Sequence, residues 1–376
     1  MTSKLLVHYL IASDASSIEA RARAIAIEQS VEMPVTAIDD ARVLSEIVGQ
    51  VLAIEDRGGG VFEAIVALEA ETVGHDSGQL LNILFGNTSI HQDVTLSAVT
   101  FPDQLTAAFP GPRHGPGGLR ARVGAGPRAL TCAALKPQGL PAAGLAELAG
   151  KLALGGLDYI KDDHSLADQR HAPFAERVSA ISAAIAAACK ETGRATRYLP
   201  SLSGNLDQLR SKVKIARDHG LDTLLVAPMV VGLPSFEAVV RENADMAFIA
   251  HPAMAGAARI APAALLGTLF RLLGADGVIF PNAGGRFGYT AATCRDIVSA
   301  ATAPLGGLKT ALPVPAGGMT LSKIPEILSF YGADAMLLIG GDLLAARPAV
   351  TRAAGEFQHT VETYRCYVAE SACGKA

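Results

Sequence analysis

Tryptophan is absent from this chain of 376 residues, and only 5% of the residues are aromatic and 18% charged. Dense runs of lysine and arginine, with or without interleaved aromatic residues, are also missing, and the formal net charge is −4. Dense basic runs and a positive net charge are typical of proteins that bind nucleic acid. We therefore expect no nucleic-acid partner, although a local positive site could still bind a small anion.

Long apolar segments are missing as well. The most apolar windows, such as residues 183–189 and 335–339, are far shorter than the roughly 20 residues that cross a bilayer. Residues 1–8 contain one lysine and then a strand-like run, which is not the layout of a signal peptide. We expect a soluble, cytoplasmic protein with no membrane partner.

Cysteine is sparse, with five residues and no Cys-x-x-Cys spacing. An odd number without that spacing indicates neither a disulfide framework nor a structural zinc site. We expect buried free thiols at all five positions. These positions are Cys132, Cys189, Cys294, Cys366 and Cys373.

Small aliphatic residues are abundant, and 50% of the chain is hydrophobic, which suffices for a large core. From residue 130 onward, short β-rich runs alternate with longer amphipathic stretches of helical period. This alternation predicts a parallel sheet with crossover helices, and eight such units favour a closed (β/α)8 TIM barrel over a doubly wound open sheet. The expected strands are residues 130–135, 157–160, 197–202, 223–228, 246–250, 277–281, 312–315 and 335–339.

The first part of the chain has a different pattern, which predicts a small α+β, ferredoxin-like N-terminal domain. Strand-like runs at 5–11 and 61–67, helices at 17–28 and 77–85, an apolar run at 35–38 and a hairpin-prone stretch at 57–60 carry this prediction. Residues 109–126, rich in Gly, Pro and Arg, read as the connection. We therefore predict two domains, 1–126 and 127–376.

Polar and glycine-rich segments follow the expected strands, where the loops of a barrel converge on its active site. Lys161 beside Asp163 would, in isolation, be an ion pair at a loop edge. A second lysine, Lys136, after the neighbouring strand instead favours a proton-transfer or metal centre. The other candidates are His251, Arg286 in a glycine-rich loop, and the pairs Gly317–Gly318 and Gly340–Gly341.

Each of these candidates has a structural alternative. His251 could be a satisfied core histidine, but its place across the ring from the lysines favours orienting or protonating a substrate. Arg286 is either a cation on a mobile lid or a solvated loop arginine. The glycine pairs either expose backbone N–H groups to a phosphate or form ordinary tight turns.

A family resemblance rests on several of these segments in order along nearly the whole chain. Residues 155–163, Gly-Gly-Leu-Asp-Tyr-Ile-Lys-Asp-Asp, resemble the metal-binding segment of the large subunit of ribulose bisphosphate carboxylase (RuBisCO). Lys136-Pro137 is similar to the family's first-strand lysine motif. The remaining matches are residues 109–115 (interdomain segment), Asn87 and Glu28 (N-terminal site residues), His251, and the two phosphate loops at Gly317–Gly318 and Gly340–Gly341.

The resemblance implies that CO2 carbamylates Lys161, which then binds Mg2+ together with Asp163, while His164 occupies the third ligand position. Mg2+ would stabilise the enediolate of a keto-sugar phosphate, and Lys136 would relay the proton. Asn87 and Glu28 would reach the barrel of a partner subunit. The implied assembly is a homodimer whose active sites are shared between subunits.

Several departures from the family pattern argue against CO2 fixation. Imidazole is a poor Mg2+ ligand, so His164 puts the metal in question. Gln138, Pro252, Arg286 and Ala316 replace a lysine, a phosphate-binding arginine, the catalytic lid lysine and a serine, respectively. The chain therefore resembles a RuBisCO-like protein that enolises its substrate.

We expect an isomerase or tautomerase of a (methylthio)pentulose phosphate. The alternatives are a decarboxylase or hydrolase of a branched 3-keto acid sugar phosphate, and a binder of sugar phosphates without catalysis.

Overall fold

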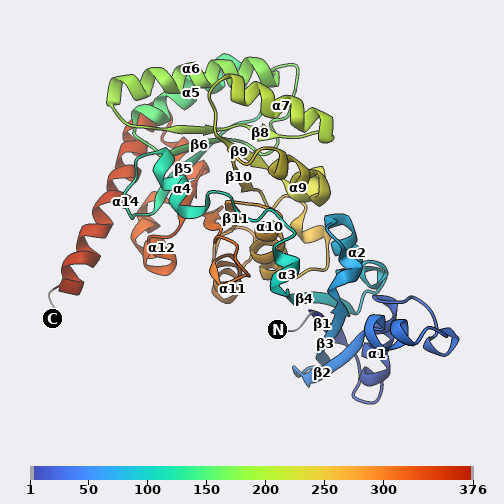
Figure 1. The fold of residues 1–376 in the computed structure, drawn as a ribbon. Helices are drawn as coiled ribbons and strands as arrows, with labels where there is room; N and C mark the ends of the chain where they lie inside the picture. Colours follow the sequence, from blue (N-terminus) through green and yellow to red (C-terminus); the bar gives the residue numbers. More distant parts are fainter. Residues whose placement is uncertain (1–3, 374–376) are drawn as a thin grey trace.

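The computed structural model describes residues 4–373 of the chain. A four-stranded antiparallel sheet occupies the N-terminal part, with the order β2-β3-β1-β4 (Figure 1). Its strands are β1 (Lys4–Ala12), β2 (Gln50–Asp56), β3 (Val61–Glu69) and β4 (Val94–Thr100), and the helices α1 (Ile18–Glu28) and α2 (Ser77–Phe85) connect them. The chain order β-α-β-β-α-β and this sheet order confirm the ferredoxin-like prediction.

Alternation of side chains builds the core of this N-terminal module. Along β1, every second residue is buried, from Leu5 through Tyr9 to Ile11, so one face packs against the helices. The run at 35–38 was expected to add an apolar element, but it forms a 3-10 turn, Val35–Ala37, without buried residues. β2 and β4 were not foreseen; β2 is an edge strand with mostly exposed or half-buried residues and lacks a clear apolar alternation.

The second sheet is a parallel barrel with the order β7-β6-β5-β13-β12-β11-β10-β9-β8. β7 and β8 are two halves of the third strand, interrupted at Pro200, whose carbonyl accepts a hydrogen bond from Leu225 N at 3.0 Å. The chain thus joins the two edges of the sheet, which confirms the predicted barrel over the open sheet. The strands are β5 (Leu130–Leu135), β6 (Tyr159–Asp162), β7 (Arg197–Leu199), β8 (Ser201–Leu202), β9 (Thr223–Val226), β10 (Ala247–Ala250), β11 (Gly277–Pro281), β12 (Leu312–Ala316) and β13 (Met336–Ile339).

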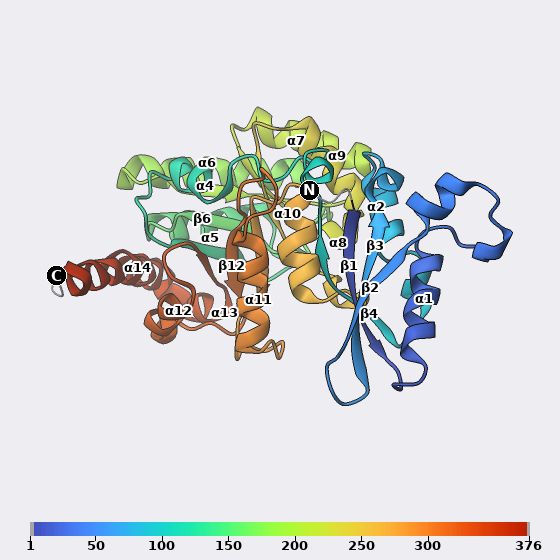
Figure 2. The ribbon, with the colours of Figure 1, turned by 60° about the horizontal axis from the view of Figure 1, so that its bottom comes forward.

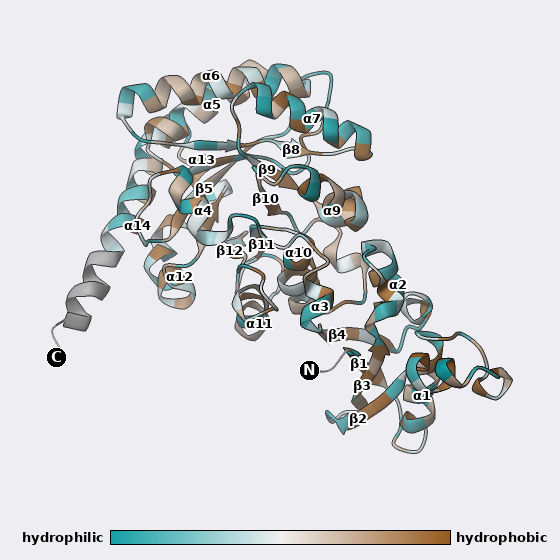
Figure 3. Ribbon diagram, in the orientation of Figure 1, coloured by the Kyte–Doolittle hydropathy of each residue, from teal (hydrophilic) through white to brown (hydrophobic). Residues whose placement is uncertain are grey.

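Helices surround the barrel, and their polar faces point outward while the strands are hydrophobic (Figure 3). The helix α7, for example, buries Leu209 and Val213 and begins with a capping box between Asn205 and Gln208. The outer helices are α5 (Ala142–Leu154), α6 (Phe174–Thr192), α7 (Leu206–Asp218), α9 (Leu233–Glu242), α10 (Phe270–Leu272), α11 (Ala291–Thr302), α12 (Ile324–Tyr331), α13 (Gly341–Ala345) and α14 (Val350–Cys373).

A short helix closes the amino end of the barrel. This helix, α4 (Gly115–Arg122), lies within the segment predicted to be a plain connection. Its Leu119 packs among the interior residues of the barrel strands, and Tyr159 Oη donates a hydrogen bond to Leu119 O at 2.7 Å. Because α4 fills this end, access to the barrel interior is left to the carboxyl ends of the strands.

The N-terminal module lies against one side of the barrel, opposite α14 (Figure 2). A strand-like exchange joins them: Leu96 N donates to Arg259 O at 3.0 Å, and Ala261 N donates to Leu96 O at 2.8 Å. Ser77 Oγ on α2 also donates to the Glu237 carboxylate on α9 at 3.3 Å. These bonds set the place of the module relative to the barrel, whereas the exact domain boundary at residue 127 stays a prediction.

No helix in the described range 4–373 is long and apolar enough to cross a membrane. Cys132 and Cys294 are buried free thiols, as expected, and Cys189 is a half-buried one. Burial raises the pKa of Cys132 to about 12, so this thiol stays protonated. The side chains of Cys366 and Cys373 lie outside what the structure describes.

Candidate active site at the carboxyl end of the barrel

Lys161 projects into the barrel from the last residues of β6. Its side chain has the same orientation as the interior residue Tyr159, because residues two apart on a strand share a face. The residue is 2% exposed, and its Nζ donates a hydrogen bond to Asp162 O at 2.8 Å. Burial lowers the pKa of Lys161, which increases the share of neutral, nucleophilic amine.

Lys136 and Asp163 form an ion pair beside Lys161. Lys136 follows β5 and is 40% exposed at its side chain, so its amine remains accessible from the mouth of the barrel. The other oxygen of Asp163 accepts hydrogen bonds from Ser165 N at 3.0 Å and Ser165 Oγ at 2.7 Å. Burial alone would raise the pKa of Asp163, but the bonds from Lys136 and Ser165 outweigh it and hold the pKa well below its usual value.

Two histidines from opposite parts of the ring meet at this point. The rings of His164, after β6, and His251, after β10, are stacked with centroids 4.1 Å apart and an interplanar angle of 13°. Burial, and then the charge of Lys161, lower the pKa of His251 to about 2, so its imidazole is neutral. His251 Nδ1 accepts a hydrogen bond from Ala253 N at 3.1 Å, which assigns the ring proton to Nε2.

Asp162 does not belong to this cluster, although the sequence places it between Lys161 and Asp163. Strand alternation turns its fully buried carboxylate outward, where it accepts hydrogen bonds from Tyr198 Oη at 2.7 Å and Arg177 Nε at 3.1 Å. Burial raises the pKa of Asp162 despite these partners. No sequence motif marks Arg177 and Tyr198 as partners of Asp162. Only the period of the strand could have indicated that the two aspartates face different sides. Asp162 anchors the end of β6 and so positions Lys161.

The glycine pairs lie on the same rim as these side chains. Gly317 and Gly318 have φ values of +82° and +72°, a region that favours glycine. A Cβ on Gly318 would lie 2.9 Å from Gly285 Cα, so the loops after β11 and β12 touch through their backbones. At Gly340 a Cβ would meet nothing within 4 Å. The amides of Gly317, Gly318 and Gly340 donate to no acceptor in the described part of the chain, which leaves them free for an anion.

Arg286 lies on the exposed loop after β11. Its guanidinium stacks on the ring of Phe287, 4.8 Å from the centroid, and Phe287 is itself 57% exposed. A Cβ on Gly318 would lie 3.2 Å from Arg286 N, so this loop lies beside the glycine loop after β12. Burial lowers the pKa of His164, and the charge of Arg286 adds to that shift. The loop thus brings one cation and one exposed aromatic ring over the site.

Glu28 and Asn87 come together in the N-terminal module. Asn87 Nδ2 donates to Glu28 Oε1 and to Glu32 Oε1, each at 2.9 Å. Glu32, with φ +52°, was not foreseen as part of this group, and no sequence motif marked it. Among the described residues, none of the hydrogen bonds of these three side chains reaches the carboxyl-end cluster of the same chain.

A metal ion would find only part of a ligand set in these protein side chains. Among the side chains that the structure describes, those of residues 4–364, no group of three His, Cys, Asp or Glu is arranged to hold one. Asp163 Oδ1 and His164 Nδ1 do form a pair, 3.4 Å apart, beside the amine of Lys161. For Lys161 to supply a third ligand, its amine must be chemically modified, because a protonated amine offers no lone pair.

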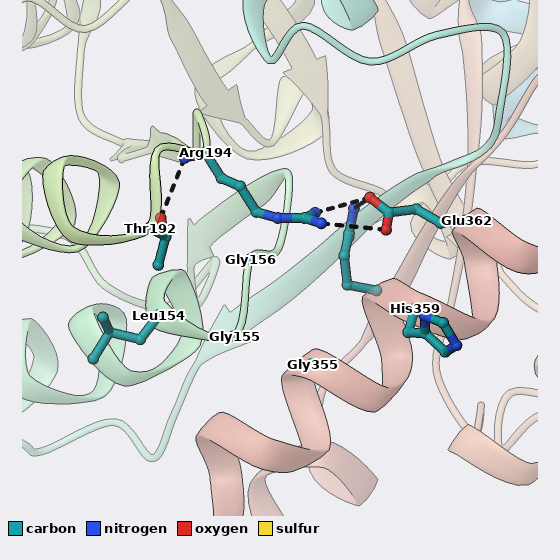
Figure 4. Close-up of a pocket in the computed structure, with 9 residues that line it drawn as sticks. Leu154, Gly155, Gly156, Thr192, Arg194, Gly355, His359 and Glu362 are labelled. Carbon is teal, nitrogen blue, oxygen red and sulfur yellow. Dashed lines mark hydrogen bonds and ion pairs between the residues drawn. The ribbon is translucent and has the colours of Figure 1, made fainter.

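A polar pocket at the opposite, amino end of the barrel is occupied by its own side chains (Figure 4). Arg194, which follows α6, forms an ion pair with Glu362 of α14, with Nη1 and Oε1 2.8 Å apart. Gln358 Nε2 also donates to Glu362 at 2.9 Å. The charged groups of this pocket, Arg194 and Glu362, are thus already paired with each other.

Comparisons with known proteins show which family the chain resembles. A family model described as the catalytic domain of the ribulose bisphosphate carboxylase large chain matches residues 118–361. The 5-methylthioribulose-1-phosphate isomerase of Rhodospirillum rubrum is 58% identical over 362 residues, which cover 96% of this chain and 97% of that protein. The 2,3-diketo-5-methylthiopentyl-1-phosphate enolase of Geobacillus kaustophilus is 35% identical over 318 residues, covering 78% of this chain and 76% of that one.

A solved structure gives the same picture for the fold. The crystal structure of a Rubisco-like protein from Rhodopseudomonas palustris superposes with a TM-score of 0.90 at 48% sequence identity. The superposition covers 97% of this chain and 99% of that chain. The similarity therefore includes the N-terminal module as well as the barrel.

Proposed function

This chain belongs to the RuBisCO large-chain family as one of its RuBisCO-like enzymes, and on that premise we propose that it isomerises a methylthiopentulose phosphate by proton transfer. The observation that carries the proposal is the convergence of Lys136, Asp163 and Lys161 at one mouth of the barrel. Two amines beside a carboxylate can take a proton from a carbon next to a ketone and return it elsewhere. The names of the relatives indicate a methylthio sugar phosphate as the substrate class.

A divalent cation and a lysine carbamate, which family members use, fit the residues present. The buried amine of Lys161 would attack CO2, forming an N–C bond and releasing one proton, and the carbamate would present oxygen to the cation. Asp163 and His164, 3.4 Å apart, would be the other protein ligands. When bound, the cation would act as a Lewis acid that stabilises the negative charge of the enolised substrate.

Lys136 is the residue best placed to move the proton. In the proposed reaction Lys136 passes its ion-pair proton to solvent and acts as the neutral amine, which removes a proton from the carbon next to the ketone; the resulting ammonium then returns a proton to the former carbonyl carbon. The ketone oxygen becomes a hydroxyl, while the neighbouring hydroxyl becomes the new ketone, so atoms and electrons balance. Neutral His251 would donate its Nε2–H to a substrate oxygen, because its Nδ1 is already bonded to Ala253 N.

The glycine loops would bind the phosphate, and the loop of Arg286 would cover it. The free amides of Gly317, Gly318 and Gly340 supply directed donors without the desolvation cost of a buried charge. The second end of the substrate would carry a methylthio group, so one phosphate site suffices. This agrees with Pro252, which follows His251 and offers no charge to a second phosphate.

We also propose a homodimer in which Glu28 and Asn87 complete the partner's site. Their hydrogen bonds do not involve the carboxyl-end cluster of their own barrel. Complementation tests this proposal: mixing an inactive Asn87→Ala chain with an inactive Lys161→Met chain should restore activity through hybrid dimers that carry one intact site. Elution as an active monomer would contradict it.

Nuclear magnetic resonance in D2O tests the reaction. We expect 5-methylthioribulose 1-phosphate to be converted to an isomer, with deuterium incorporated next to the carbonyl to an extent set by how well Lys136 is shielded from solvent. The 2,3-diketo-5-methylthiopentyl phosphate serves as the second substrate, because the Geobacillus relative is named for it. Labelled CO2 should not be incorporated into ribulose 1,5-bisphosphate. Failure of every keto-pentose phosphate to react or exchange would contradict the proposal.

A further inference from the structure

We infer that the cation site after β6 selects a later first-row transition-metal dication, such as Co2+, over Mg2+ through the imidazole of His164. This inference rests on the cation and lysine-carbamate site proposed above, at Lys161, Asp163 and His164, but not on which reaction takes place there. It rests on the position, accessibility and donor chemistry of His164, taken in turn below.

The position of His164 suits a shared ion. His164 Nδ1 lies 3.4 Å from Asp163 Oδ1. Neighbouring ligands of an octahedral ion with bonds of about 2.1 Å are separated by about 3 Å. The two atoms therefore need to approach each other by only a few tenths of an ångström to bind one ion, a shift that the imidazole can make within the plane of its ring.

Neighbouring groups leave the imidazole of His164 available and orient it. The side chain is 43% exposed at the mouth of the barrel, so an ion can reach it. Stacking on His251, with centroids 4.1 Å apart, holds the plane of the ring. His251 cannot offer its own Nδ1 to the same ion, because that nitrogen already accepts the Ala253 N–H at 3.1 Å. His164 is thus the one histidine at this site with a ring nitrogen free for an ion.

Donor chemistry then determines the preferred ion. Mg2+ demands oxygen ligands and keeps its waters, whereas imidazole suits the later first-row ions, and the affinity of a site with nitrogen and oxygen ligands rises from Mn2+ through Co2+ to Ni2+. Asp163 has little capacity to compensate as a two-oxygen ligand, because Lys136 occupies one oxygen and Ser165 donates twice to the other. Replacing the nitrogen of His164 by a carboxylate should therefore strengthen Mg2+ binding and weaken Co2+ binding.

Calorimetric titration with bicarbonate present tests this inference on the whole protein. Co2+ and Mg2+ are titrated into the wild type, His164→Glu and the control His219→Glu, which makes the same change at an exposed position after α7. We expect the ratio of Co2+ to Mg2+ affinity to fall at least tenfold in His164→Glu and to stay unchanged in the control. An unchanged ratio in His164→Glu, or no saturable binding of either ion to the wild type, overturns the inference.

Pulsed electron paramagnetic resonance of the Mn2+-loaded protein gives a second readout that does not require activity. A nitrogen coupling from a ligating imidazole should be present in the wild type and in His219→Glu, and absent in His164→Glu. Persistence of the coupling in His164→Glu, or its absence from the wild type, overturns the inference. Thermal unfolding of all three proteins shows whether each variant is folded.

Discussion

The two ends of the barrel differ in how completely their buried charged groups are hydrogen-bonded. At the amino end, Asp276 accepts hydrogen bonds from His114 N at 2.6 Å, Gly115 N at 2.8 Å and Phe248 N at 3.0 Å, and thereby caps the start of α4. Asp158 receives two hydrogen bonds from Arg128, at 2.6 and 2.7 Å. Each buried carboxylate here has partners for its lone pairs.

At the carboxyl end the pairing is incomplete. Lys161 is buried with a single hydrogen bond to a backbone carbonyl, and the amides of the glycine loops have no acceptor in the described chain. Burying a charge without full compensation costs stability, whereas a satisfied network contributes to it. We infer that the paired charges at the amino end stabilise the fold, and that the incompletely paired groups at the carboxyl end are available to a ligand.

Among the variants that test this difference between the two ends, replacing Lys161 should have the largest effect, which is on kcat. Lys161→Met keeps the length of the side chain but removes the amine, so we expect kcat to fall by about 10⁴-fold, on the scale of losing a metal centre or a general base. Stability should be unchanged or slightly higher, because a poorly compensated buried amine is lost. Turnover and thermal unfolding are the measurements. Lys309→Met, an exposed lysine at the amino end, is the control. Retained turnover in Lys161→Met would remove Lys161 from the catalytic groups, whereas a wild type without turnover, with its sugar-phosphate affinity nearly intact in Lys161→Met, would favour a binder without catalysis.

Replacing Lys136 should have the second largest effect. We expect kcat/KM to fall by about 10²- to 10⁴-fold in Lys136→Ala, the usual range for a proton-transfer residue. Lys136→Arg separates proton transfer from ion pairing, because a guanidinium can pair with Asp163 but does not release its proton near neutral pH. We expect Lys136→Arg to remain inactive and to lose deuterium exchange. Rescue by arginine would show that Lys136 only positions Asp163.

At the amino end, Asp276→Ala should lower the free energy of unfolding by about 3 kcal/mol, because three buried or half-buried backbone N–H groups lose their acceptor. Urea unfolding measures this change. The kcat per folded molecule should stay near the wild-type value, since Asp276 lies at the far end of the strands. A large loss of kcat in fully folded Asp276→Ala would contradict the assignment of a structural role to the amino end and of the active site to the carboxyl end.

A pair of glycine substitutions gives the smallest and sharpest test. Gly340→Ala and Gly117→Ala each add a methyl group where no atom lies within 4 Å, one at each end of the barrel. Gly340→Ala should raise KM about tenfold, or about 1.4 kcal/mol, by intruding on the phosphate. Gly117→Ala, within α4, should leave KM unchanged and stabilise the protein by about 0.5–1 kcal/mol. Equal KM values for the two variants would contradict the proposal that Gly340 binds the phosphate.

Much of the barrel and its rim could be predicted because period and order are properties of the chain itself. The strand at residues 130–135 was predicted with its observed bounds. Lys136 follows β5 and Lys161 lies near the end of the adjacent β6, so a parallel sheet must bring them to one edge. The edge strand β2 was missed because few of its residues are buried, and α4 was missed because its glycine-rich sequence favours a loop. Both depend on partners distant in sequence.

The sequence by itself determined the βα repeat, the residue types on the rim and the family they resemble, because hydrophobic period and local motifs need no distant contacts. Only the tertiary structure decided that Asp162 turns away to Arg177 while Asp163 pairs with Lys136, and that His164 stacks on His251. The physical reason is that a side chain's partner is set by strand register and ring closure. These bring residues 87 positions apart in the chain into contact and separate neighbours onto opposite faces.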